Sequence, residues 1–222
     1  MNDNHKPSAT SQVQTRHSNR ILGFSDGVFA IAITLLVLTL ELPSNLTSSE
    51  EVSSFLWEAL PQVVVYAASF MVIGTFWVRH HRMFDISRAV DGRMLVLNLV
   101  FLAFVALLPF PSDLLGNDQT TGTVIAFCAV AGAATLCEFG MWRHLDRHRE
   151  LLLPEIPGER IAALKTWRLW SLGVLIVCIL VSVLSLRIAV LMLLALFPVY
   201  EVVYHRRHHR RERILYLLRD DR

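Results

Sequence analysis

The first apolar stretch of the chain, RILGFSDGVFAIAITLLVLTLEL at residues 20–42, decides how the whole sequence is read. Its apolar part, residues 21–42, is long enough to cross a membrane, because about 20 residues of helix match the roughly 30 Å hydrocarbon core of a bilayer. Arg20, Ser25 and Asp26 stand in its first turns. The stretch follows a polar segment and lacks a small-residue cleavage site, so we expect a retained span rather than a signal peptide.

The composition extends this reading to the whole chain. Hydrophobic residues make up 54% of it and charged residues 18%, whereas soluble domains carry about 25% charged residues. The apolar runs are continuous rather than alternating, which favours transmembrane helices over a β-barrel. We therefore predict an all-α membrane protein with six transmembrane helices, at about 21–42, 57–79, 93–112, 120–142, 167–186 and 188–205.

The basic residues predict the orientation. With six spans, 20 of the 21 lysines and arginines fall on one side of the membrane, and only Arg187 falls on the other. The positive-inside rule then places both termini in the cytoplasm and the protein in the cytoplasmic membrane. We predict a disordered cytoplasmic N-terminus at 1–19, a six-helix domain at 20–206 and a basic tail at 207–222. The tail sets orientation or touches anionic lipid, and nucleic acid is not expected as a partner.

At helical spacing the first span shows two stripes. One consists of small residues, which let a neighbouring helix approach closely: Gly23, Gly27, Ala30 and Thr34. The other is purely aliphatic: Ile31, Leu35 and Leu38. Judged from the residues alone, lipid contact is favoured for the aliphatic stripe over the lining of a pore.

The charges at the start of this span have a structural and a functional interpretation. Asp26 lies six residues after Arg20, only about 9 Å along a helix, so both sit near the cytoplasmic boundary. In the favoured interpretation Arg20 snorkels to the interface and Asp26 pairs with an arginine of a neighbouring helix. The alternative is that the pair attracts ions directly. Asn98, in the third span, is expected to hydrogen-bond to another helix.

The remaining polar residues carry less chemistry. His81 and Asp85 have the spacing of two metal ligands on one helix face, which falls short of a zinc site, so no metal is predicted. Trp77, Arg79 and His80 are expected at the cytoplasmic interface. Glu138 is expected to meet a basic neighbour such as Arg143. The three cysteines are treated as small core residues, and no catalytic cluster or cofactor signature is found, so the sequence does not predict an enzyme.

Several motifs together resemble the transmembrane protein 175 family of potassium channels. Arg20-x-x-x-Phe24-Ser25-Asp26 resembles the family signature, and GVFAIAITLLVL, which follows it, resembles the prokaryotic members. FWVRHHRMF after the second span and LNLVFLAFVALLPFP in the third are similar as well. The resemblance covers the first half of the chain closely.

This resemblance implies a potassium-permeable channel. Animal relatives carry two six-span repeats and form dimers, so this single-repeat chain is expected to be a homotetramer whose first helices line the pore. The family's constriction corresponds to Ile31, with Leu35 and Leu38 one and two turns further out. A ring of such side chains can gate by dewetting. Thr34 and Thr39 are candidate pore-lining residues, and His81 and Asn98 are the expected partners of the motif.

Two other classes of membrane protein are alternatives to the channel. A secondary transporter or proton-coupled carrier usually shows inverted repeats and helices broken at mid-membrane, and the sequence shows neither. A sensor or scaffold with the basic tail as its working end is the third candidate. Saturable uptake driven by a counter-ion would favour the transporter, and absence of ion flux would favour the scaffold.

Overall fold

The protein is described here from a computed structural model that covers residues 9–40, 48–154, 156, 158–193 and 195. Apart from a β-bridge between Ser87 and Leu152, the regular structure of this part of the chain is helical. The elements are α1 (Ala9–Leu35), η1 (Leu36–Thr39), α2 (Ser49–Glu58), α3 (Leu60–Asp85), α4 (Gly92–Leu107), α5 (Pro109–Asn117), α6 (Thr121–Arg147), η2 (Arg149–Leu151) and α7 (Gly158–Leu184).

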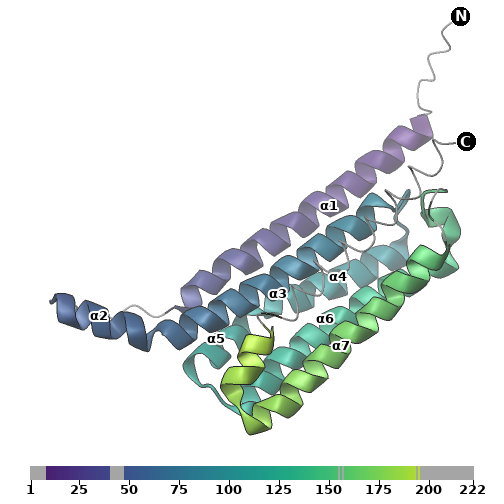
Figure 1. The fold of residues 1–222 in the computed structure, drawn as a ribbon. Coiled ribbons are helices and arrows are strands. Elements are labelled where there is room, and N and C mark those ends of the chain that lie inside the picture. The colour runs from purple at the N-terminus through teal and green to yellow at the C-terminus, as the bar shows by residue number, and fades with distance from the viewer. Residues whose placement is uncertain (1–8, 41–47, 155, 157, 194, 196–222) are drawn as a thin grey trace, which may run out of the picture.

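The long helices lie side by side and form a helical bundle. α1 packs against α3 and α4, α6 packs between α4 and α7, and α5 closes one end against α3 and α6. Figure 1 shows α1 and α7 at opposite edges of this bundle, and α2 projecting away from it. The core lies among α3, α4 and α6, where Phe76, Phe101 and Phe127 are almost completely buried. α1 lies outside this core, at the edge of the bundle, and contacts it through α3 and α4.

Four helical stretches are long and apolar enough to cross a membrane: Arg20–Thr39, Leu60–Asp85, Gly92–Asn117 and Thr121–Arg147. A shorter apolar helix covers Leu169–Leu184. The prediction of a helical, multi-pass membrane protein is confirmed. The fifth predicted span coincides with the shorter helix. The sixth is described only as far as residues 188–193 and 195, which are helical, and six spans therefore stay a prediction.

Local chemistry fixes several helix ends. The Ser48 side chain accepts from the Glu51 amide and Glu51 reaches back, which forms a capping box at the start of α2. Asp91 caps α4 by accepting from the Met94 amide at 2.8 Å. Pro109 begins α5 directly after α4 ends, because prolines cannot donate to the preceding turn. The third predicted span, at about 93–112, is thus made of α4 and the first turn of α5.

The N-terminal region differs from its prediction. Disorder was expected over residues 1–19, whereas α1 begins at Ala9; residues 1–8 lie outside the described part. Once an apolar helix has formed, adding residues to its end requires no new nucleation. A polar segment without hydrophobic period can therefore continue a helix that its own pattern does not predict. The predicted tail at 207–222 also lies outside the described residues.

Candidate functional site

One face of α1 is built into the bundle. Its buried positions are Ser25, Phe29 and Ala32, continued by Leu36 at the start of η1, and each is at most 1% exposed. They are spaced by four, three and four residues, the period of a single helix face. Phe29 packs 6.0 Å from the ring of Phe101 on α4. These contacts fix which side of α1 faces inward.

The opposite face of α1 has no cover within the described chain. Ile31 is 61% exposed and Leu35 42%, and Leu38, in the adjoining η1, is 75% exposed. The small-residue stripe, Gly23 to Thr34, lies beside them on the same open side, and a side-chain carbon added at Gly23 or Gly27 would meet nothing within 4 Å. The structure thus brings both predicted stripes onto one surface and leaves room there for another helix.

The two threonines of this segment turn their hydroxyls toward their own backbone. Thr34 Oγ1 donates to the carbonyl oxygens of Ala30 (3.0 Å) and Ile31 (2.9 Å). Thr39 Oγ1 donates to the Leu36 carbonyl at 2.7 Å, within η1. Since the hydroxyl proton is used in these bonds, the oxygen lone pairs remain available as acceptors. Thr34 is exposed and can present them to a cation passing along the open face.

A buried chain of hydrogen bonds connects α3, α4 and α1 behind that face. His80 Nε2 lies 2.7 Å from Asn98 Oδ1, Asn98 Nδ2 donates to Ser25 Oγ at 3.1 Å, and Ser25 Oγ donates to the Ile21 carbonyl at 2.9 Å. Because the Asn98 amide nitrogen is the donor toward Ser25, its oxygen must accept from His80. The direction of the whole chain then runs from α3 to α1.

Aromatic rings surround the histidine that starts this chain. His80 stacks parallel to Phe101 with ring centroids 5.6 Å apart, and Phe84 and Phe29 lie 4.5 and 5.6 Å away. Its other ring nitrogen, Nδ1, is buried and has no hydrogen-bond partner among the described residues. This arrangement suits a neutral imidazole that carries its proton on Nε2.

The charged residues of the motif lie at the edge of the bundle. Asp26 Oδ1 accepts from Trp77 Nε1 at 2.9 Å, and Trp77 stacks on His81 with centroids 5.6 Å apart. Arg20 and Phe24 are exposed. The prediction paired Asp26 with an arginine of a neighbouring helix. Instead an indole N–H holds the carboxylate, because α1 and α3 lie side by side at this level.

The two expected motif partners separate in the structure. Asn98 lies directly against Ser25 in the buried chain. His81 faces outward, about half exposed, and its Nε2 lies 3.8 Å from Asp85 Oδ2. The histidine that reaches the motif is its neighbour His80, whose side chain is turned about 100° away from that of His81 and is buried. Within the described chain, no group of three or more His, Cys, Asp or Glu residues is placed to hold a metal ion.

An ion pair crosses the centre of the bundle. Arg79 Nη2 lies 2.7 Å from Glu138 Oε2, and both side chains are at most 1% exposed. Arg79 Nη1 also donates to Ser171 Oγ of α7 at 3.3 Å. The sequence predicts Arg79 at the cytoplasmic interface and Glu138 beside a basic neighbour such as Arg143. Both expectations are wrong, because α6 continues to Arg147 and so leaves Glu138 inside the bundle, facing α3.

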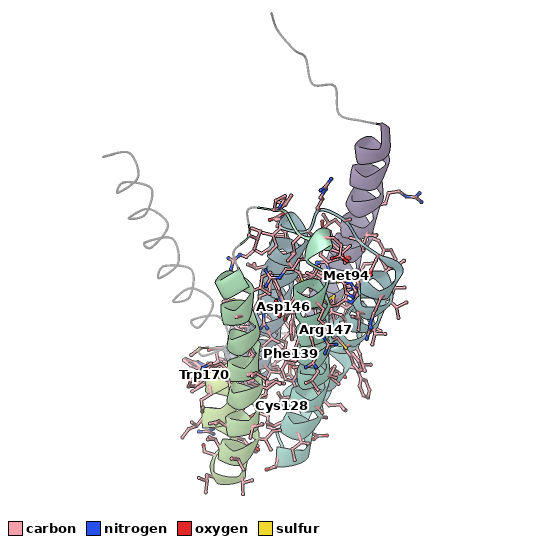
Figure 2. All side chains as sticks on the ribbon, turned by 90° about the vertical axis from the view of Figure 1, so that its right-hand side faces the viewer. Met94, Cys128, Phe139, Asp146, Arg147 and Trp170 are labelled. Atoms are coloured by element: carbon pink, nitrogen blue, oxygen red, sulfur yellow. The ribbon has the colours of Figure 1, made fainter. Side chains whose placement is uncertain are left out.

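A second acidic residue organises the end of the bundle where α4 begins. Asp91 Oδ2 lies 2.8 Å from His144 Nε2 on α6, while its other oxygen caps α4. Burial favours the neutral carboxyl, but the Met94 amide and His144 together outweigh it, so the pKa of Asp91 lies below its ordinary value of 3.8. Figure 2 shows Asp146 and Arg147 at this end, and Trp170 pointing outward from α7.

Known proteins share both the sequence and the fold. The profile of the endosomal/lysosomal potassium channel TMEM175 matches residues 20–109. A potassium channel of Streptomyces collinus is 36% identical over 70% of this chain and 78% of its own length. The mouse endosomal/lysosomal proton channel TMEM175 is 33% identical over 62% of this chain, which corresponds to 30% of the mouse protein.

A solved structure supports the same assignment. The crystal structure of a lysosomal potassium-selective channel TMEM175 homologue from Chamaesiphon minutus superposes with a TM-score of 0.68. It is 27% identical and covers 84% of this chain and 97% of its own. The resemblance stated from the motifs is confirmed. The chain belongs to the TMEM175 family of ion channels and is accordingly a transport protein, not an enzyme.

Proposed function

We propose that this protein is a potassium-permeable channel of the cytoplasmic membrane, assembled as a homotetramer around four copies of α1. The observation that carries the proposal is the open face of α1. Ile31, Leu35 and Leu38 lie there in one row, directly opposite a face that is pinned to α3 and α4. Four such rows around an axis form a narrow apolar neck.

The buried hydrogen-bond chain favours a pore over plain lipid contact. Turning α1 by one residue rotates its side chains by about 100°. Such a turn would separate Ser25 from Asn98 and move Ile31 off the open face. A helix that only meets lipid gains little from so precise an orientation, whereas a pore-lining helix must present the same atoms in every subunit. The chain therefore supports a role for α1 in which its rotation matters.

The permeant ion is proposed from the relatives and from the chemistry of the neck. Two relatives, from Streptomyces and Chamaesiphon, carry the description potassium channel. An apolar ring can hold the pathway closed by excluding water, and it opens when the ring widens enough to wet. The outward lone pairs of Thr34, and those of Thr39 one and a half turns beyond, offer polar contacts to a dehydrating cation.

Orientation and span count complete the proposal. Six spans per subunit put both termini on the cytoplasmic side, in agreement with the concentration of basic residues there. The motif residues Arg20 and Asp26 then lie at the cytoplasmic entrance. Asp26 is engaged by Trp77, which supports the structural interpretation of this carboxylate over a direct role in attracting ions.

The test compares one polar substitution at two equally exposed sites. Ile31→Asn is expected to wet the neck and raise potassium flux into liposomes. The matched control is Val96→Asn on α4, because Val96 is 59% exposed and Ile31 61%. Unchanged flux in Ile31→Asn, or an equal rise in both variants, would remove Ile31 from the constriction. Reversal potentials under potassium and sodium gradients identify the permeant ion, and saturable counter-ion-driven uptake would support a transporter instead.

A further inference from the structure

A pocket at the end of the bundle remote from the start of α1 has no part in the proposed pore. Its volume is about 640 Å³, within the usual range of small-molecule sites. It lies where α3 begins, where α5 ends and where the chain turns back after α7. Figure 1 shows these three segments meeting at the end from which α2 projects.

The rim of this pocket carries one charge of each sign. Glu58 ends α2 and Arg187 follows α7, and both are exposed side chains that line the pocket. Neither side chain forms a hydrogen bond or ion pair with another of the described residues. Gln62 and Asn117 also line the pocket and bond to each other at 3.2 Å. The rim thus offers an unused cation and an unused anion.

Below the rim the pocket becomes apolar. Val64 follows Leu60 by one turn along α3, and Leu191 follows Arg187 by one turn, so each lies about 6 Å deeper. Leu60 and Leu191 are about half exposed, and Val190 closes the wall. Leu60 begins one candidate span and Asn117 ends another. The change from charged rim to apolar wall therefore lies where two candidate membrane spans begin and end.

We infer that this pocket binds a phospholipid with a primary ammonium headgroup, of the phosphatidylethanolamine class. The Arg187 guanidinium binds the phosphate with its fork of donors. The Glu58 carboxylate accepts N–H bonds from the ammonium, which a quaternary choline cannot donate. The acyl chains follow the wall formed by Leu60, Val64 and Leu191. Trp57, 73% exposed at the rim, lies at the depth where indoles favour the interface.

The inference is tested by lipid retention, independently of ion flux. The full-length protein is purified, delipidated and exposed to phospholipids that have an ethanolamine, a choline or a glycerol headgroup and identical acyl chains. The bound lipids are counted by native mass spectrometry. Arg187→Gln is expected to weaken retention of all three about tenfold or more. Glu58→Gln is expected to weaken only the ethanolamine lipid by a similar factor. Arg88→Gln, which changes an exposed arginine near the other end of α3, serves as the matched control.

Each outcome supports or overturns the proposal. Equal retention of ethanolamine and choline lipids by the wild type, unchanged in Glu58→Gln, would remove the ammonium from the assignment. Retention in Arg187→Gln equal to that in Arg88→Gln would overturn the site as a whole. A changed oligomeric state in Arg187→Gln, without a change in bound lipid, would assign the pocket to a neighbouring subunit instead. Circular dichroism of each variant separates these results from misfolding.

Discussion

Replacing Asn98 by leucine removes the residue that connects α3, α4 and α1. Asn98 is 0% exposed, and it accepts from His80 and donates to Ser25. Asn98→Leu therefore leaves the His80 Nε2–H buried without an acceptor, which costs about 1–3 kcal/mol. Hydrogen bonds between membrane helices are worth about 0.6 kcal/mol on average and up to about 1.7. We expect a loss of about 1–3 kcal/mol, with the lower half of that range favoured by the membrane data.

The second arm of the experiment removes the orphaned group. His80→Phe alone leaves the Asn98 oxygen unpaired, but the ring itself fits, since His80 already lies among Phe29, Phe84 and Phe101. Replacing both partners by apolar groups of similar shape can be nearly neutral. The double variant His80→Phe/Asn98→Leu is therefore expected to be more stable than the two separate losses predict, with a coupling energy of about 1 kcal/mol.

Equilibrium unfolding in SDS, followed by far-UV circular dichroism, measures all four proteins of this cycle. His81→Phe is the control, because His81 is the next residue of the same helix but its side chain is about half exposed; surface changes of this kind stay within about 0.5 kcal/mol. Strictly additive losses would refute the hydrogen-bond chain as an energetic unit. If the chain also sets the rotation of α1, Asn98→Leu changes potassium flux as well.

Three further predictions concern other supports of the bundle. Arg79→Met should destabilise the protein by about 3–5 kcal/mol, because it leaves Glu138 charged and buried. The double variant Arg79→Met/Glu138→Leu should regain most of this stability in SDS unfolding, and an equal loss of stability in the single and the double variant would contradict this prediction. Asp91→Ala should cost about 1 kcal/mol through the lost helix cap, whereas Asp91→Asn keeps the cap. Because the pKa of Asp91 is lower in the folded protein than its ordinary value of 3.8, the ionised carboxylate stabilises the fold at pH values above 3.8. This stabilisation is lost as the pH falls through the lowered pKa of the folded protein. The stability gap between wild type and Asp91→Asn should therefore close in acid, and a constant gap would exclude the linkage. Trp77→Phe should loosen α1 by releasing the Asp26 carboxylate, raising the hydrogen-exchange rate of the first turns of the span; unchanged exchange would assign Trp77 to the lipid interface.

The apolar pattern alone was sufficient for much of the architecture. Runs of about 20 apolar residues must form helices in lipid, because no water is present to satisfy exposed backbone groups. The first four predicted spans accordingly coincide with the four candidate membrane helices. The motif around Ser25 identified the family, since that requires only the order of residues along the chain.

Helix length and facing were less predictable. The fourth span was predicted at about 120–142, and the helix that contains it, α6, runs on to Arg147. That extension decides whether Glu138 lies at a surface or inside. A polar residue with charged neighbours in the sequence, such as Arg79, is predicted to lie at the membrane interface. The structure buries Arg79 instead. The available signal was Glu138 itself, a carboxylate within an apolar run.

The sequence by itself determined that this protein is a helical membrane protein of the TMEM175 family, since hydrophobic length and local motifs are properties of the chain taken one segment at a time. Only the tertiary structure decided which side chains meet: His80 rather than His81 behind Ser25, Trp77 on Asp26, and Arg79 on Glu138. Neighbouring residues on a helix point about 100° apart. Which of them turns inward depends on how the helices pack, and that is set by all the helices together.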